Sequence, residues 1–149
     1  RNTLFSLSVE PNQTMTLAMN VSASPPAGEA VMERTLNFYM GLEPNVQLQI
    51  QGQLRLHINQ TELNEELGRL VNGSALTWMY WNQTQSQWTP VESYMDQNGY
   101  LVCNTDHFST WTVAEYDPEL VPEGIHLYAV VGLVIIVSVA SIYLKRKKK

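Results

Sequence analysis

Apolar and polar side chains alternate along residues 45–58, NVQLQIQGQLRLHI. Successive side chains of an extended strand point to opposite faces, so the pattern predicts a strand with one apolar and one polar face. Such a strand suits an antiparallel sheet that packs one face on a core and exposes the other. Gly52 takes an inward position, which indicates a bulge or bend. The other inward residues are Val46, Leu48, Ile50, Leu54, Leu56 and Ile58.

Shorter segments with similar alternation precede and follow this strand. Turn signals separate some of them, notably Pro25 and Pro26 and the stretch Asp96–Gly99. The additional predicted strands are residues 5–9, 15–21, 36–40, 75–81, 87–91, 100–103 and 109–116. Many short strands with frequent turns favour an all-β fold, an antiparallel β-sandwich.

One helix is predicted over residues 61–71, with Thr61 as its N-cap and the pair Asn72–Gly73 at its exit. Four apolar residues recur at helical spacing and would share one face. They are Leu63, Leu67, Leu70 and Val71. We therefore expect residues 1–116 to form a β-sandwich with one short crossover helix.

Residues 125–144, IHLYAVVGLVIIVSVASIYL, contain no Asp, Glu, Lys or Arg. As an α-helix this segment would be about 30 Å long, which matches the hydrocarbon core of a bilayer. Tyr128 and Tyr143 fall near its two ends, where amphipathic rings lie in the membrane interfaces. We predict a single transmembrane helix over residues 125–144, preceded by an acidic, proline-containing linker over residues 117–124.

Consecutive cations end the chain: Lys145, Arg146, Lys147, Lys148 and Lys149. Cationic residues next to a transmembrane helix stay on the cytoplasmic side, so residues 145–149 are predicted to be a cytoplasmic tail and residues 1–124 to be extracellular. This single-pass type I orientation in the plasma membrane requires a signal peptide upstream of Arg1. We therefore expect the sequence to be a fragment or a processed product of a longer protein.

Acceptor sequences for N-glycosylation occur on the side predicted to be extracellular. They begin at Asn12, Asn20, Asn59, Asn72 and Asn82. Because Asn59 and Asn72 flank the predicted helix, we expect both of its ends to be exposed. The expected partners are the lipid bilayer, N-linked glycans and other cell-surface proteins or glycans.

Charge and residue spacing argue against several other functions. Residues 1–124 contain four arginines and 14 acidic residues, a balance that repels nucleic acid. His57, His107 and His126 show none of the spacings of metal sites, and we expect no metal, no cofactor and no catalysis. Cys103 lies in the apolar run YLVC, where we expect a buried and unreactive thiol.

Tryptophans cluster between residues 78 and 111, and Trp81 and Trp88 flank the turn at Asn82. If these two rings were exposed and coplanar they could stack on sugars, so a carbohydrate-binding sandwich is one alternative function. The other interpretation is that the rings are buried in core and cross-strand packing.

Residues 80–116 carry three short motifs: W-x-x-V at Trp88–Val91, D-x-x-G at Asp96–Gly99 and the tripeptide His107-Phe108-Ser109. This segment resembles the closing hairpins of β-sandwich domains in archaeal and bacterial surface proteins of the PGF-pre-PGF-like group. The resemblance implies a surface domain ahead of a C-terminal membrane anchor. Its expected role is structural, adhesive or envelope-spacing.

The tripeptide His107-Phe108-Ser109 also resembles the autoproteolytic site of GAIN-like and nucleoporin-type domains. In those domains the backbone is cut just before Ser or Thr. The resemblance implies that the Ser109 hydroxyl attacks the Phe108 carbonyl while His107 assists proton transfer. A self-cleaving surface module is therefore a second alternative function.

Pro122 and Glu123, followed by the apolar segment and the basic tail, resemble the tripartite sorting signals read by exosortases or archaeosortases. Gly124 departs from the usual Pro-Glu-Pro or Pro-Glu-Phe. The resemblance implies C-terminal processing, and the other interpretation is a stiff linker with an ordinary stop-transfer sequence.

Overall fold

The computed structural model describes residues 5–11, 13–46 and 49–117. Contacts divide the chain into two units, Arg1–Tyr116 and Asp117–Lys149. Within the described ranges, no helix is both long enough and apolar enough to span a membrane. The predicted transmembrane helix over residues 125–144 lies outside those ranges.

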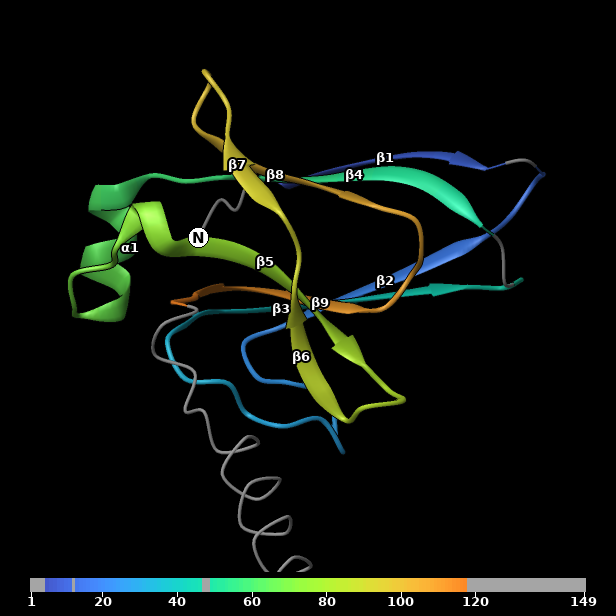
Figure 1. Cartoon of the computed structure of the whole chain (residues 1–149), viewed down its shortest axis with the longest axis horizontal. Coiled ribbons are helices and arrows are strands. Elements are labelled where there is room, and N and C mark those ends of the chain that lie inside the picture. Colours follow the sequence, from blue (N-terminus) through green and yellow to red (C-terminus); the bar gives the residue numbers. More distant parts are fainter. Residues whose placement is uncertain (1–4, 12, 47–48, 118–149) are drawn as a thin grey trace, which may run out of the picture. The chain divides into compact units, whose positions relative to one another are not determined.

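Two antiparallel sheets form the described fold (Figure 1). One sheet has the strand order β1 (Phe5–Pro11), β4 (Ile50–His57), β8 (Tyr100–Thr105) and β7 (Ser93–Met95). The other has the order β2 (Leu17–Ser22), β3 (Thr35–Pro44), β9 (Thr110–Glu115), β5 (Leu76–Asn82) and β6 (Gln87–Pro90). The predicted class, antiparallel β with two sheets, is confirmed.

The main core lies between the two sheets, where inward side chains of β3, β5 and β9 meet those of β4 and β8. Trp78 and Trp111 are both 0% exposed in this core. The indole Nε1 of Trp78 donates a hydrogen bond of 3.0 Å to the carbonyl oxygen of Leu101 in the facing sheet. The two sheets are therefore joined by apolar packing and by this polar contact.

A second apolar cluster lies on the opposite face of the five-stranded sheet. Its buried members are Tyr39, Met79, Trp81, Trp88 and Ala114. The indole Nε1 of Trp88 donates a hydrogen bond of 2.7 Å to the Ala30 carbonyl oxygen, and Met32 packs against the cluster. Residues 23–34, between β2 and β3, therefore cover this face, so that both faces of the sheet are packed.

The predicted crossover helix is present as α1 (Gln60–Leu67), which connects β4 of one sheet with β5 of the other. Its predicted N-cap is wrong. Asn59, not Thr61, is the N-cap, and its Oδ1 accepts a hydrogen bond of 3.4 Å from the Glu62 N–H. An asparagine oxygen in this position satisfies one of the unpaired N–H groups of the first turn.

The helix also ends earlier than predicted. Gly68 ends α1 in the left-handed conformation, with φ at 62°, as glycine does readily because it has no Cβ. Leu70 therefore lies beyond the helix and is 85% exposed instead of sharing its apolar face. The pair Asn72–Gly73 begins a short 3-10 turn, η1 (Gly73–Ala75), instead of ending α1.

The strand predicted over residues 45–58 is shorter in the structure, because β3 ends at Pro44 and β4 begins at Ile50. The Asn45 N–H donates to the Thr16 carbonyl oxygen at 2.9 Å, and the Asn45 Oδ1 accepts from the Thr16 N–H at 2.8 Å. These bonds hold a bend that leaves Val46 38% exposed. Within β4 the alternation is confirmed, since the buried residues are Ile50, Leu54 and Leu56.

Gly52 does not mark a bulge, because β4 keeps an unbroken register with both β1 and β8. A Cβ at this position would lie 3.2 Å from the Ser8 carbonyl oxygen and 3.3 Å from Cγ2 of Thr105. The glycine therefore permits a close approach between neighbouring strands.

The alternation predicted over residues 15–21 is confirmed only in part. Leu17 packs against the main core, whereas Met19 and Val21 are 55% and 52% exposed. β2 is an edge strand of the five-stranded sheet. An edge position explains why the same apolar pattern that buries a central strand leaves these two side chains accessible.

Cys103 is fully buried in β8, as predicted. Burial raises the pKa of its thiol to about 12, so the reactive thiolate is scarce at pH 8. We expect the folded chain to react with a chromogenic disulfide reagent about a hundredfold or more slowly than the urea-unfolded chain. Equal rates in the two states would contradict the burial.

Candidate functional site

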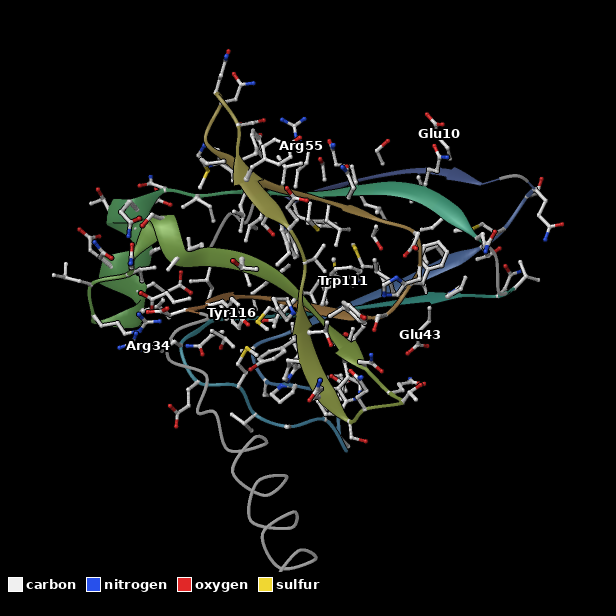
Figure 2. The ribbon with its side chains drawn as sticks, viewed as in Figure 1. Glu10, Arg34, Glu43, Arg55, Trp111 and Tyr116 are labelled. Carbon is white, nitrogen blue, oxygen red and sulfur yellow. The ribbon has the colours of Figure 1, made fainter. Side chains whose placement is uncertain are left out.

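The connection between β8 and β9, residues 106–109, separates two hollows. The inner hollow, of about 580 Å³, is lined by residues of both sheets, and His107 and Tyr80 line both hollows. The outer hollow, of about 770 Å³, lies on the face of the five-stranded sheet that carries the second cluster. Figure 2 shows Trp111, which lines the inner hollow, between the two sheets.

The His107 ring is held among aromatic side chains. Its centroid lies 4.6 Å from that of Tyr80 and 5.5 Å from that of Trp111. His107 Nδ1 lies 2.7 Å from Asp106 Oδ1, and this hydrogen bond holds the pKa of Asp106 below its ordinary value. Since an ionised carboxylate only accepts, Nδ1 carries the proton and Nε2 is an acceptor in the neutral ring. Within the described ranges, His107 Nε2 and Trp111 Nε1 are buried without a hydrogen-bond partner.

The geometry of His107-Phe108-Ser109 shows what the proposed self-cleavage would have to change. The Ser109 hydroxyl donates to the Trp81 carbonyl oxygen at 2.8 Å, so its proton is directed away from His107. The described non-glycine residues with positive φ all lie outside the tripeptide. Cleavage would require a different orientation of Ser109, and two fragments separated before Ser109 on a denaturing gel would establish it.

The outer hollow contains a carboxylate and two of the sequon asparagines. Glu29, from the loop of residues 23–34, accepts a hydrogen bond of 2.6 Å from the Thr110 hydroxyl on Oε1. Its other oxygen, Oε2, is buried without a partner within the described ranges, and burial raises the pKa of Glu29. Asn20 of β2 and Asn82 at the end of β5 both line this hollow.

The described sequon asparagines are accessible: Asn20, Asn59 and Asn72 are exposed, and Asn82 is half-buried. The expected exposure at both ends of the helix segment is therefore confirmed. Asn72 Oδ1 accepts from the Ser74 N–H at 3.2 Å and Asn82 Oδ1 accepts from the Thr84 N–H at 3.0 Å. Asn59 uses its Oδ1 in the same way. At Asn59 and Asn72 the internal bond engages only Oδ1 and leaves Nδ2, the atom that a glycan modifies, available for attachment, whereas Asn82 Nδ2 also donates to Gln85 Oε1 at 3.2 Å.

Trp81 and Trp88 do not form the exposed coplanar pair that sugar stacking would need. They are 8% and 9% exposed, and their rings meet edge to face at 62° with centroids 5.4 Å apart. They are direct cross-strand partners of β5 and β6. The interpretation as cross-strand packing is confirmed, and this pair offers no sugar platform.

Sequence reasoning missed Glu29 and Thr110, which the fold brings together from positions 81 residues apart. Neither belongs to a motif, and no pattern in the sequence could have paired them. Among the described residues, no group of three or more His, Cys, Asp or Glu side chains is placed to hold a metal ion.

Several predicted site residues lie outside the described ranges. They are the sequon residue Asn12, the sorting-like pair Pro122 and Glu123, and the basic residues Lys145, Arg146, Lys147, Lys148 and Lys149.

No protein-family model, curated protein or solved structure matches the chain. The proposals below therefore depend on the residues of the chain itself and on their geometry.

Proposed function

We propose that this chain is a membrane-anchored module of a cell-surface glycoprotein, with its β-sandwich outside the cell and a structural, adhesive or envelope-spacing role. Residues 125–144 cross the plasma membrane once, and the five terminal cations hold the tail on the cytoplasmic side. The proline-containing linker over residues 117–124 sets the distance between the sandwich and the bilayer.

The observation that carries the proposal is the placement of the sequon asparagines. In the described part of the chain they lie on an edge strand, beside α1 and η1, and at the β5–β6 turn. Asn59, Asn72 and Asn82 each use Oδ1 for a local bond, and a glycan on Nδ2 preserves such a bond. Glycans at these places add bulk at the surface without disturbing the core.

Glycans near sheet edges also have a protective effect. An edge strand presents unpaired N–H and C=O groups that can pair with a strand of another chain. Asn20 lies in the edge strand β2, and Asn82 adjoins the edge strand β6. A surface module crowded against its neighbours would be kept from edge-to-edge association by glycans at these two positions.

The test is to express the chain behind a signal peptide in an N-glycosylating host. We expect glycan mass at several sequons, which peptide-N-glycosidase removes, and digestion of residues 1–116 by protease added outside intact cells. The matched control replaces the sequon Thr or Ser by Ala at each site and should remove glycan mass one site at a time. Unmodified asparagines together with a protease-shielded N-terminal portion would contradict the proposal.

A further inference from the structure

We propose that the outer hollow is a binding site for the first sugar residue of a glycan attached to Asn20. This inference rests on the proposed function, because it requires that the chain is glycosylated, and it adds a specific binding site for the chain's own glycan. The ligand class is a neutral, hydroxyl-rich sugar residue linked to Nδ2.

Asn20 faces this hollow. In β2 the inward residue Leu17 packs on the main core, so Asn20 and Ser22, which have the opposite parity, point to the other face of the sheet. Both line the outer hollow. Within the described ranges, no hydrogen bond engages the Asn20 amide, in contrast to the other three described sequon asparagines.

Room for a sugar exists beside Asn20. Its partner across the β2–β3 ladder is Gly41, which also lines the hollow. A Cβ added at Gly41 would meet nothing closer than the Asn20 carbonyl oxygen at 4.0 Å. The space that a side chain would fill at this position is therefore open, directly across the ladder from the residue that carries the glycan.

The hollow also offers groups that suit a sugar. Glu29 lines the hollow, and its Oε2 is a buried acceptor without a partner in the described part of the chain. A rotation of the carboxylate that exposed Oε2 would let a sugar hydroxyl donate to it. The Thr110 hydroxyl fixes the orientation of this carboxylate through Oε1.

Asn59 and Asn72 provide internal comparison sites. Both are exposed and neither lines the inner or the outer hollow. A glycan on either of them would extend into solvent. Asn20 is therefore expected to behave differently from these two sites in the same molecule.

The experiment measures site-by-site glycan removal from the folded, full-length glycoprotein by peptide-N-glycosidase, followed by peptide mass spectrometry. We expect removal at Asn20 to be about tenfold or more slower than at Asn59 and Asn72, as one added hydrogen bond to a charged group would produce. After denaturation the three rates should converge. The Gly41→Val variant, which places a side chain in the open space across the ladder from Asn20, should bring the native rate at Asn20 close to that at Asn59.

Two further variants distinguish a sugar that is bound in the hollow from a glycan linkage that the strand alone shields from the enzyme. Glu29→Gln keeps the shape but replaces the acceptor carboxylate, and should raise the rate at Asn20 severalfold. Glu62→Gln, next to the Asn59 site, should leave the rate at Asn20 unchanged. A urea titration of each deglycosylated variant checks that the sandwich is folded.

Native removal at Asn20 as fast as at Asn59 would overturn the inference. So would slow removal that Gly41→Val leaves unchanged, because shielding by the strand alone would then be responsible. Full occupancy at Asn59 and Asn72 with none at Asn20 would overturn the inference and leave the proposed function standing. If no sequon carried a glycan, both would fall.

Discussion

Replacing Trp78 by alanine is expected to lower the free energy of unfolding by about 4 kcal/mol, the range for a large aromatic removed from a core. Trp78 is 0% exposed, and its ring meets those of Phe5, Phe38 and Trp111 at centroid distances of 6.3 to 6.5 Å. The change also leaves the Leu101 carbonyl oxygen without its donor from the other sheet. Urea denaturation followed by circular dichroism measures the loss.

The matched control is Leu70→Ala, since Leu70 is 85% exposed and lies outside α1. Its effect should stay within about 0.5 kcal/mol. If Trp78→Ala cost no more than the control, the position of Trp78 between the two sheets would be contradicted.

The double variant Val134→Arg, Ile135→Arg is expected to move the chain almost completely from the membrane fraction to the soluble fraction. Both residues lie in the middle of the apolar segment over residues 125–144. An arginine at the centre of a transmembrane helix costs about 2.5 to 3.5 kcal/mol, so two of them remove most of the driving force for insertion. Carbonate extraction of membranes followed by immunoblotting measures the distribution.

A variant with the same number of substitutions, Val134→Leu and Ile135→Leu, keeps the apolar character and should remain in the membrane fraction. Retention of the arginine variant after carbonate extraction would mean that residues 125–144 do not anchor the chain. Release of both the arginine and the leucine variants from the membrane fraction would likewise contradict the role of residues 125–144 as an anchor.

Local signals predicted the class of the fold and much of its strand content. Alternation identified β4 because one of its faces is buried against the other sheet, and the turn at Asp96–Gly99 is present. There Gly99 has a positive φ of 79°, and Asp96 Oδ1 accepts from the Asn98 N–H at 2.8 Å. Such features depend on residues that are close in sequence, and for that reason they can be predicted directly from the sequence.

Features that depend on tertiary contacts were missed. The bend that shortens the strand over residues 45–58 is held by bonds between Asn45 and Thr16. The choice of Asn59 over Thr61 as the N-cap lies between two residues that both cap helices well, so propensity alone could not decide it.

The candidate site could be predicted only as separate parts. The sequons and the tripeptide at His107 are visible in the sequence, but the hollow that Asn20, Gly41, Glu29 and Thr110 all line depends on strand order. The placement of β9 between β3 and β5 joins segments that are far apart in the chain, and no local pattern specifies it.

That placement has a mechanical consequence. β9, the last strand in the described part of the chain, forms ladders with β3 on one side and β5 on the other. A pull along β9 toward its C-terminal end would load both ladders in shear, so their hydrogen bonds would resist together instead of unzipping one at a time from an edge. The sandwich is thus suited to bear tension at the end where the proposed membrane attachment would apply it.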